Sequence, residues 1–139
     1  SPHPEGIGAV FCMEKAIEHA GITKESVDYI NTHGTSTGMG DPIETNAIAE
    51  LFSEHAGEMA VTSTKGATGH MMGAGGITCI QCIRTGVVPP TLNLDELDEK
   101  CASLNYVPHK AIEKEVRVAM SNSFGFGGQN SSVIFCRYE

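Results

Sequence analysis

The sequence lacks three features that would each define a class of protein: a long apolar run, a cluster of basic residues and a disulfide framework. Without an apolar run of about 18 residues, no segment is expected to span a membrane, and no signal peptide is recognisable. Nine lysines and arginines against 17 acidic residues give a net charge of −8. Because these basic residues form no run or patch, a nucleic-acid partner is not expected.

The cysteines are too few and too scattered to form a disulfide framework. Their number is odd, and they stand at positions 12, 79, 82, 101 and 136. This distribution fits buried thiols in a reducing compartment, so we expect a cytoplasmic protein. Cys79 and Cys82 form a C-x-x-C pair inside an apolar helical segment, with no second pair to complete a zinc site. Packing in the core is therefore the favoured interpretation, and we expect no metal.

Two kinds of catalytic pattern are also missing. The two glycine-rich patterns of nucleotide-binding proteins, G-x-G-x-x-G and G-x-x-x-x-G-K-[ST], are both incomplete, so nucleotide binding has little support. No cysteine follows a strand at a tight turn beside a histidine, so the sequence shows no setting for a nucleophile.

What is present indicates one globular domain covering residues 1–139, with 40% hydrophobic and 19% charged residues. Periodicity predicts helices at 8–20, 42–54, 71–85 and 95–101, and strands at 27–32, 60–63, 104–107, 116–121 and 131–137. The last two strands are joined through a glycine turn at 125–128. Strands that alternate with helices favour a layered α/β fold that ends in a hairpin-like pair.

The start of the second helix carries a strong local signal. Asp41 stands at the N-cap, Pro42 at the first helical position and Glu44 at the third. Asp41 and Glu44 are therefore expected to cap this helix. The glycines of residues 73–76 predict close packing of the next helix against another backbone, since glycine is otherwise unfavourable in a helix.

Three glycine-rich loops indicate a functional site. They cover residues 31–42, 63–70 and 122–128. The first two carry His33 and His70, which can donate a hydrogen bond to an oxygen where charge develops, or move a proton. The alternative is that each histidine only holds its own loop in place.

Other polar residues of these loops have two possible roles. Lys65 and Asp41 either orient a histidine or pair with each other, and Asp41 is also explained by capping alone. Thr35 and Thr37 either offer hydroxyls to a polar ligand or form local turn bonds.

These loops resemble the motifs of β-ketoacyl-acyl carrier protein synthases, the condensing enzymes of the thiolase fold. Residues 31–41 are similar to the HGTST…GD motif, residues 63–70 to the second histidine motif, and residues 122–130 to the C-terminal glycine turn. The segments 88–93 and 106–108 match as well. The resemblance is collinear over nearly the whole chain, and the type II, fatty-acid elongating synthases look most similar.

The resemblance implies a decarboxylative Claisen condensation of malonyl-carrier protein with an acyl thioester. It implies that His33 and His70 stabilise the enolate and that Lys65 supports them. Thr35 and Thr37 would meet the phosphopantetheine arm of the acyl carrier protein, and no cofactor would be bound by the chain itself.

The same resemblance gives roles to the third loop. Phe126 would gate the acyl pocket and contribute its backbone N–H to the oxyanion hole. Phe124 and Gly125 would lie against the substrate.

Two departures from the family pattern shape the expectation. No position matches the family's nucleophilic cysteine, which lies in the N-terminal half of these enzymes. We therefore expect the C-terminal half of a thiolase-like fold, with a mixed sheet covered by helices and its first strand absent. Such a chain would be inactive alone and would need its N-terminal half, in a full-length enzyme that is a homodimer. Cys79 also stands where type II synthases often have glutamate, which changes their usual polar network.

Three alternatives remain open. A polyketide ketosynthase fragment would share the chemistry and differ in substrate, and a thiolase-like enzyme would use coenzyme A in place of carrier protein. A non-catalytic partner subunit of a condensing enzyme would not need both His33 and His70.

Overall fold

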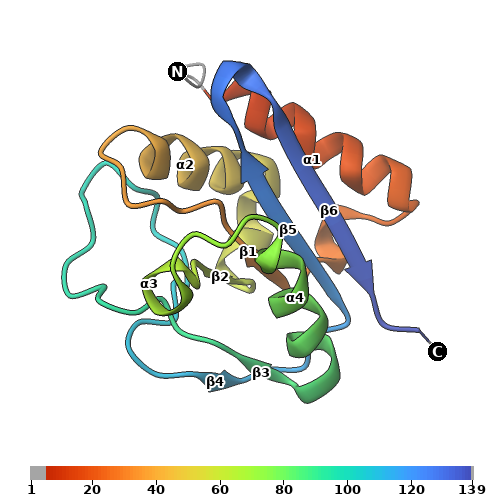
Figure 1. The fold of residues 1–139 in the computed structure, drawn as a ribbon. Coiled ribbons are helices and arrows are strands. Elements are labelled where there is room, and N and C mark those ends of the chain that lie inside the picture. The colour runs from red at the N-terminus through yellow and green to blue at the C-terminus, as the bar shows by residue number, and fades with distance from the viewer. Residues whose placement is uncertain (1–5, 139) are drawn as a thin grey trace.

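A four-stranded mixed sheet forms the centre of the molecule (Figure 1). The computed structural model describes residues 6–138, with the exception of the Phe126 side chain. The strand order is β2 (Ala60–Thr62), β1 (Tyr29–Asn31), β5 (Val118–Phe124) and β6 (Asn130–Cys136). A separate antiparallel pair is formed by β3 (Val87–Val88) and β4 (Ile112–Glu113).

Three strands of the main sheet run parallel, and this arrangement places their ends together. Tyr29 of β1 is in register with Ala60 of β2 on one side and with Ala119 of β5 on the other. The last strand, β6, is antiparallel to β5, with Met120 opposite Ile134. The carboxyl ends of β1, β2 and β5 therefore meet at one edge of the sheet, where α/β proteins commonly build their sites.

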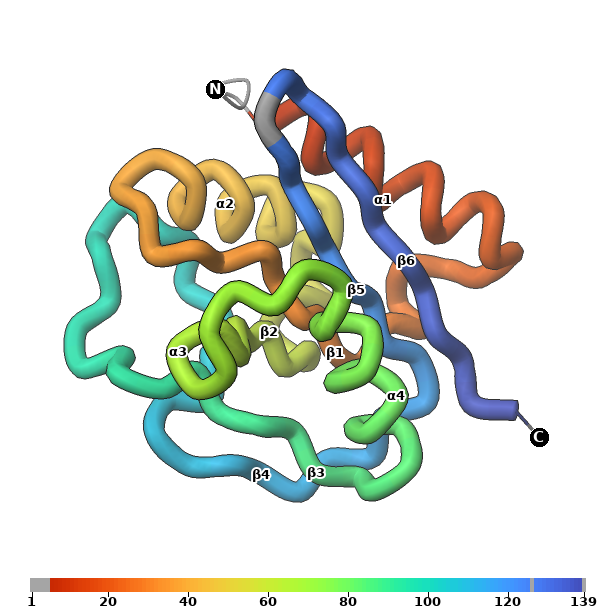
Figure 2. Tube along the Cα trace, in the orientation of Figure 1, coloured from red at the N-terminus to blue at the C-terminus, as the bar shows by residue number. Residues whose placement is uncertain are grey.

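Helices cover both faces of this sheet, as Figure 2 shows along the chain trace. Helices α1 (Ile7–Ala20) and α2 (Gly40–Phe52) pack on one face, and α4 (Ala74–Thr85) packs on the other. Ile30 of β1 points into the core with α1 and α2, while its neighbour Tyr29 points into the core with α4. This alternation follows from the two-residue period of a strand. The expected mixed sheet covered by helices is confirmed.

Short 3₁₀ turns complete the structure at 24–26, 53–57 and 126–128. The described part of the chain contains no helix that is both long and apolar enough to cross a membrane.

Most of the expected elements are present. Helix α1 ends at Ala20, and Gly21 adopts the left-handed conformation with φ of 66°, as expected of a terminating glycine. The helix expected at 71–85 begins only at Ala74, because Gly69 and Gly73 have positive φ and interrupt helical geometry. Before this interruption, a short helix α3 (Lys65–Thr68) forms where a loop was expected.

Two expectations between β3 and β5 are wrong. Residues 95–101 form turns and not a helix, because Asp98 binds the backbone N–H of Lys100 through its side chain and that of Cys101 through its carbonyl. Residues 104–107 form no strand but a single parallel bridge between Asn105 and Ala60.

The glycines at the start of α4 pack differently from the prediction. A Cβ on Gly75 would lie 2.6 Å from Ser121 Oγ and 2.7 Å from Asn31 Oδ1, and one on Gly76 would lie 3.0 Å from the Phe135 ring. The helix therefore packs closely against side chains of the sheet and not against another backbone.

Candidate functional site

The structure brings the two histidines together at the carboxyl edge of the sheet. His33 follows β1, and His70 follows β2 and the short helix α3. Their ring centroids lie 5.7 Å apart, with the ring planes at 78°. Phe124, at the end of β5, lies 6.0 Å from His33 between ring centroids. All three glycine-rich loops thus contribute a side chain to one place.

The backbone at His33 is held by a buried carboxylate. The N–H groups of His33 and Gly34 donate to the two oxygens of Glu44, at 2.9 and 3.0 Å. Gly34 has a φ of 37°, and a Cβ there would lie 2.6 Å from Thr32 Oγ1, so the turn requires glycine. Glu44 is 2% exposed and also accepts a hydrogen bond from Asn122 Nδ2 at 3.3 Å.

The sequence pattern predicts only a capping role for Glu44 and does not predict its hydrogen bonds to the turn after β1. The signal that distinguishes it is its position four residues before the buried Ile48, on the face of α2 that points into the core. A carboxylate on such a face requires buried donors, and the turn after β1 supplies them.

Asp41 does not act as the expected N-cap, because α2 begins one residue earlier at Gly40. Its carboxylate instead accepts the backbone N–H groups of Ser36 and Thr37, at 3.1 and 3.4 Å. The hydroxyl of Thr37 accepts the N–H of Gly40 at 3.0 Å. These bonds close the loop between His33 and α2. Thr37 is exposed and Thr35 half-buried on this loop.

Burial and the charges around His33 favour its neutral form. Burial lowers the pKa of His33, and the nearby charges of Lys65 and His70 lower it further, against the opposing effect of Asp41. Lys65 is half-buried and its Nζ donates to the carbonyl of Thr32 at 3.3 Å. Burial lowers the pKa of Lys65 as well. A neutral imidazole can donate one hydrogen bond to a ligand without gaining a proton.

In the third loop, residues 122–128, the structure describes the backbone turn but not the side chain of Phe126. The N–H of Gly125 donates to the carbonyl of Gln129 at 2.7 Å and closes the hairpin between β5 and β6. Phe126 begins the 3₁₀ turn of residues 126–128, and its side chain lies outside the described structure.

The thiol of Cys79 is buried in the core between α4 and the sheet. It donates to the carbonyl of Met120 at 3.4 Å, and burial raises its pKa to about 12. Cys82 is buried beside it, with its pKa raised to about 11 by burial. Core packing of the C-x-x-C pair is thus confirmed. Among the described residues, no group of three or more His, Cys, Asp or Glu side chains is placed to hold a metal ion.

Comparison with known protein families identifies the family to which this chain belongs. Residues 1–95 match the family model described as beta-ketoacyl synthase, C-terminal domain. This chain belongs to that family. The expected membership in the β-ketoacyl synthase family is thereby confirmed.

Relatives of this synthase domain are similar over its whole length. It is 47% identical to 3-oxoacyl-(acyl-carrier-protein) synthase 2 of Coxiella burnetii and 46% identical to that of Rhizobium meliloti. These alignments cover 98% and 99% of the chain but 34% and 33% of the relatives. The chain thus spans about a third of the length of the curated relatives that it matches.

Solved structures of condensing enzymes superpose closely on this synthase domain. A beta-ketoacyl synthase from Burkholderia phymatum superposes with a TM-score of 0.89 at 34% identity, over 98% of this chain and 34% of that one. The ishigamide ketosynthase/chain length factor gives a TM-score of 0.90, also at 34% identity, over 99% of this chain and 35% of that one. The expected thiolase-like fold is confirmed.

Proposed function

We propose that this chain supplies the two-histidine part of the active site of a 3-oxoacyl-acyl carrier protein synthase. The observation that carries the proposal is the 5.7 Å separation of the His33 and His70 rings at the carboxyl edge of the sheet. Two imidazole N–H groups in so small a space can both donate to one thioester oxygen. Such paired donors lower the free energy of an enolate or other oxyanion far more than that of the uncharged carbonyl.

In the proposed reaction, an acyl group is held as a thioester on a cysteine outside this chain. Malonyl-carrier protein loses carbon dioxide, and the electron pair of the broken carbon–carbon bond moves into the thioester as an enolate. His33 and His70 stabilise the enolate oxygen. The enolate carbon then attacks the acyl thioester, a new carbon–carbon bond forms, and the cysteine leaves as thiolate. Buried, protonated thiols such as Cys79 do not suit the nucleophile's role.

Fatty acid elongation is the pathway class we favour. The relatives at 43–47% identity are 3-oxoacyl-acyl carrier protein synthases, whereas the similar structures whose titles name a polyketide system are 25–29% identical. Polyketide synthesis remains the alternative, because the chemistry at His33 and His70 would be the same in both pathways.

Two protein partners follow from this function. One is acyl carrier protein, whose phosphopantetheine arm would pass Thr35 and Thr37. One similar structure is a ketosynthase in complex with an acyl carrier protein, which supports this partner. We place the complex in the cytoplasm, and the free thiols are compatible with a reducing compartment.

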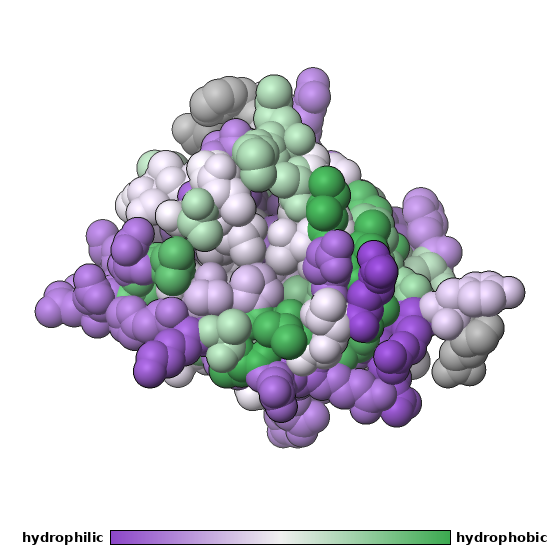
Figure 3. All heavy atoms as spheres, turned by 60° about the horizontal axis from the view of Figure 1, so that its bottom comes forward, coloured by the Kyte–Doolittle hydropathy of each residue, from purple (hydrophilic) through white to green (hydrophobic). Residues whose placement is uncertain are grey.

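The other partner is the polypeptide segment that carries the nucleophile. On α4, Ile77 and Ile80 are 65% and 42% exposed and lie three residues apart, so they adjoin on the helix surface, and adjoining exposed apolar side chains indicate an interaction surface. Figure 3 shows hydrophobic surface on the face of the molecule that includes the lower side of Figure 1. We propose that this surface is covered in the assembled synthase, which we expect to be a homodimer.

The experiment compares this chain alone with the synthase assembly, meaning this chain together with the polypeptide that supplies the nucleophilic cysteine. Each is incubated with acyl-carrier protein and then malonyl-carrier protein. We expect the acyl adduct, by intact mass, on the added polypeptide, and 3-oxoacyl product only from the assembly. A stoichiometric adduct on a cysteine of this chain would overturn the proposal. Preferred elongation of polyketide intermediates would favour the alternative pathway.

A further inference from the structure

Strand β6 leaves one edge of the main sheet open. Within the part of the chain that the structure describes, β6 pairs with β5 on one side and with no strand on the other. Figure 1 shows β6 at the margin of the sheet, with α1 running alongside it. We propose that two copies of this chain pair through these edges, with their β6 strands antiparallel about a two-fold axis. No step of this proposal depends on the function proposed above for His33 and His70.

The backbone of β6 presents hydrogen-bonding groups to the open edge at every second residue. At the two ends of the β5–β6 pair, the N–H of Arg137 donates to the carbonyl of Arg117, and the N–H of Gly125 donates to the carbonyl of Gln129. The odd-numbered residues of β6 therefore face β5, and the backbone groups of the even-numbered residues face outward. The outward-facing residues are Asn130, Ser132, Ile134 and Cys136. Such a row of N–H and C=O groups is a template for another strand.

The sequence of β6 gives this edge none of the usual protection. Proteins block open edges with charged side chains, with proline or by keeping the edge strand very short. In contrast, β6 is seven residues long, and residues 130–136 include no charged residue and no proline. The edge is therefore free to pair with a further strand.

A groove between α1 and β6 adjoins the open edge. It is lined by one side of α1, including Phe11, Lys15 and His19, and by the first residues of β6. None of the described residues that line it is acidic, although the chain as a whole carries a net charge of −8. Two copies of an acidic chain repel each other least where neither presents a carboxylate. The groove and the edge therefore suit a second copy of this chain.

The two-fold axis passes through Val133, the middle residue of β6. Antiparallel pairing then places the outward-facing Ser132 opposite Ile134 of the second copy, and such a pair exchanges two backbone hydrogen bonds. Val133 comes opposite its own counterpart in a non-hydrogen-bonded pair. This side chain is 47% exposed, so the contact removes apolar surface from water on both chains.

Helix α1 permits this approach because the side that lines the groove carries small residues. Since α1 packs along β6, the two-fold axis brings two α1 helices side by side. Gly8, Cys12 and Ala16 line the groove at intervals of four residues, so they lie on one face of the helix. Phe11, which is 59% exposed, is covered by the second helix in this arrangement.

The test measures the oligomeric state of this chain by sedimentation velocity over a range of concentrations. Wild type should form a particle with the mass of two chains. Ser132→Pro removes an outward-facing N–H but no hydrogen bond to β5, and should raise the dissociation constant of the dimer at least about tenfold. Ser132→Ala is the matched control. It also loses the hydroxyl that donates to Asn122 Oδ1, but it keeps the N–H and should dimerise as wild type does.

A cysteine at position 133 tests the register. Opposite residues of a non-hydrogen-bonded pair have Cα atoms about 4.5 Å apart, which a disulfide can span. Oxidation of Val133→Cys should therefore link two chains at position 133, as peptide mapping by mass spectrometry would show. Ser131→Cys is the control, because position 131 and its counterpart would be about 13 Å apart. A link at 131 but not at 133 would overturn the proposed pairing.

A wild-type chain that stays monomeric would overturn the proposal, and the edge would then be open to an extended segment of another polypeptide. So would a dimer that survives Ser132→Pro and is lost in Ile80→Lys, because the exposed apolar surface of α4 would then be the interface. If Ser132→Pro does not fold, Val133→Lys takes its place. Like charges directly opposite each other destabilise a strand pair, so an unchanged dimer in Val133→Lys would count against the proposal.

Discussion

His33 and His70 meet edge to face, with their ring centroids 5.7 Å apart, although each comes from a different strand-to-helix connection. The contact depends on β1 and β2 being adjacent and parallel, so that both connections leave the sheet at the same edge. Each histidine lies on its own loop, one after β1 and the other after β2. We therefore expect the two residues to be separable by mutation.

Replacement of either histidine should remove one donor to the enolate oxygen. For His33→Ala and His70→Ala in the synthase assembly, we expect kcat for malonyl decarboxylation to fall about 10²–10³-fold each. His19→Ala is the control, because His19 is exposed in the last turn of α1. If both variants, or the double variant, kept the wild-type rate, this chain would be a non-catalytic partner subunit.

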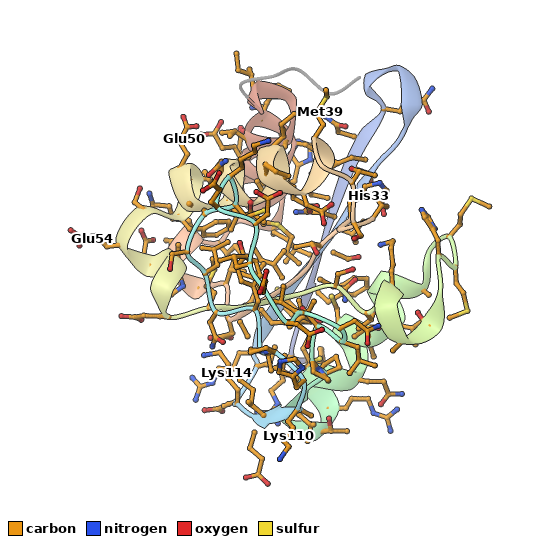
Figure 4. The ribbon with its side chains drawn as sticks, turned by 90° about the vertical axis from the view of Figure 1, so that its left-hand side faces the viewer. His33, Met39, Glu50, Glu54, Lys110 and Lys114 are labelled. Carbon is orange, nitrogen blue, oxygen red and sulfur yellow. The ribbon has the colours of Figure 1, made fainter. Side chains whose placement is uncertain are left out.

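The pKa of His33 should be measurably low. Burial and the charge of Lys65 are its two largest causes, so a ¹³C NMR titration should give a midpoint below the ordinary value of 6.5. The change Lys65→Met removes the second cause and should raise the midpoint toward 6.5. Lys110→Met should leave it unchanged, because Lys110 is exposed and lies far from His33 in Figure 4. Equal midpoints in wild type and Lys65→Met would contradict this account.

The lowered pKa of His33 also makes the free energy of unfolding depend on pH. Below pH 6.5 the unfolded chain binds a proton at His33 more readily than the folded chain, so the free energy of unfolding rises with pH in that window. The contribution of His33 is fully present above 6.5 and is lost as pH falls through the lowered pKa. Urea unfolding of wild type and His33→Gln between pH 4 and 8 should show the difference between them shrinking or changing sign at low pH. A constant difference would count against the shift.

The buried thiols should be unreactive in the folded protein. Burial raises the pKa of Cys79 to about 12 and that of Cys82 to about 11, so both are protonated at pH 8 and shielded as well. Iodoacetamide should modify the exposed Cys136 first, and Cys79 and Cys82 only after unfolding in urea. Peptide mapping by mass spectrometry gives the order. Modification of Cys79 under native conditions would mean that α4 opens readily.

The change Gly75→Ala should destabilise the fold, although alanine favours a helix more than glycine does. A Cβ there would lie 2.6 Å from Ser121 Oγ, inside contact distance, whereas nothing lies within 4 Å of one at Gly38. Alanine gains about 1 kcal/mol of helix propensity, but overpacking costs about 1–3 kcal/mol. Urea unfolding should therefore show Gly75→Ala losing stability and Gly38→Ala changing little. A stabilised Gly75→Ala variant would show that the side chains at this contact move aside.

Much of the fold could be predicted from local patterns. The apolar stripe of residues 8–20, closed by Gly21, is a complete local signal, and α1 ends where it predicts. The meeting of His33 and His70 was also anticipated, because each histidine follows a strand and lies among glycines. Parallel strands then bring such positions to one edge.

The remaining features depend on contacts that no local pattern contains. Asp41 and Glu44 fit the start of a helix, yet both side chains bind the preceding loop, and only the tertiary turn at Gly34 makes that possible. The segment 95–101 has helix-forming residues, but Asp98 binds the backbone there and closes a turn instead. Local propensity is a weak guide where tertiary hydrogen bonds compete.

The sheet order has a consequence for how the molecule acquires its structure. Strand β5 lies between β1 and β6, so the central strand of the parallel set has an open edge until residues 118–124 join it. During synthesis, β1 and β2 leave the ribosome long before β5, and the backbone N–H and C=O groups on one edge of β1 stay without their strand partner until β5 arrives. Contacts so distant in sequence slow folding. The site around His33 therefore forms late, and a nascent chain arrested before β5 should be a preferred client of chaperones.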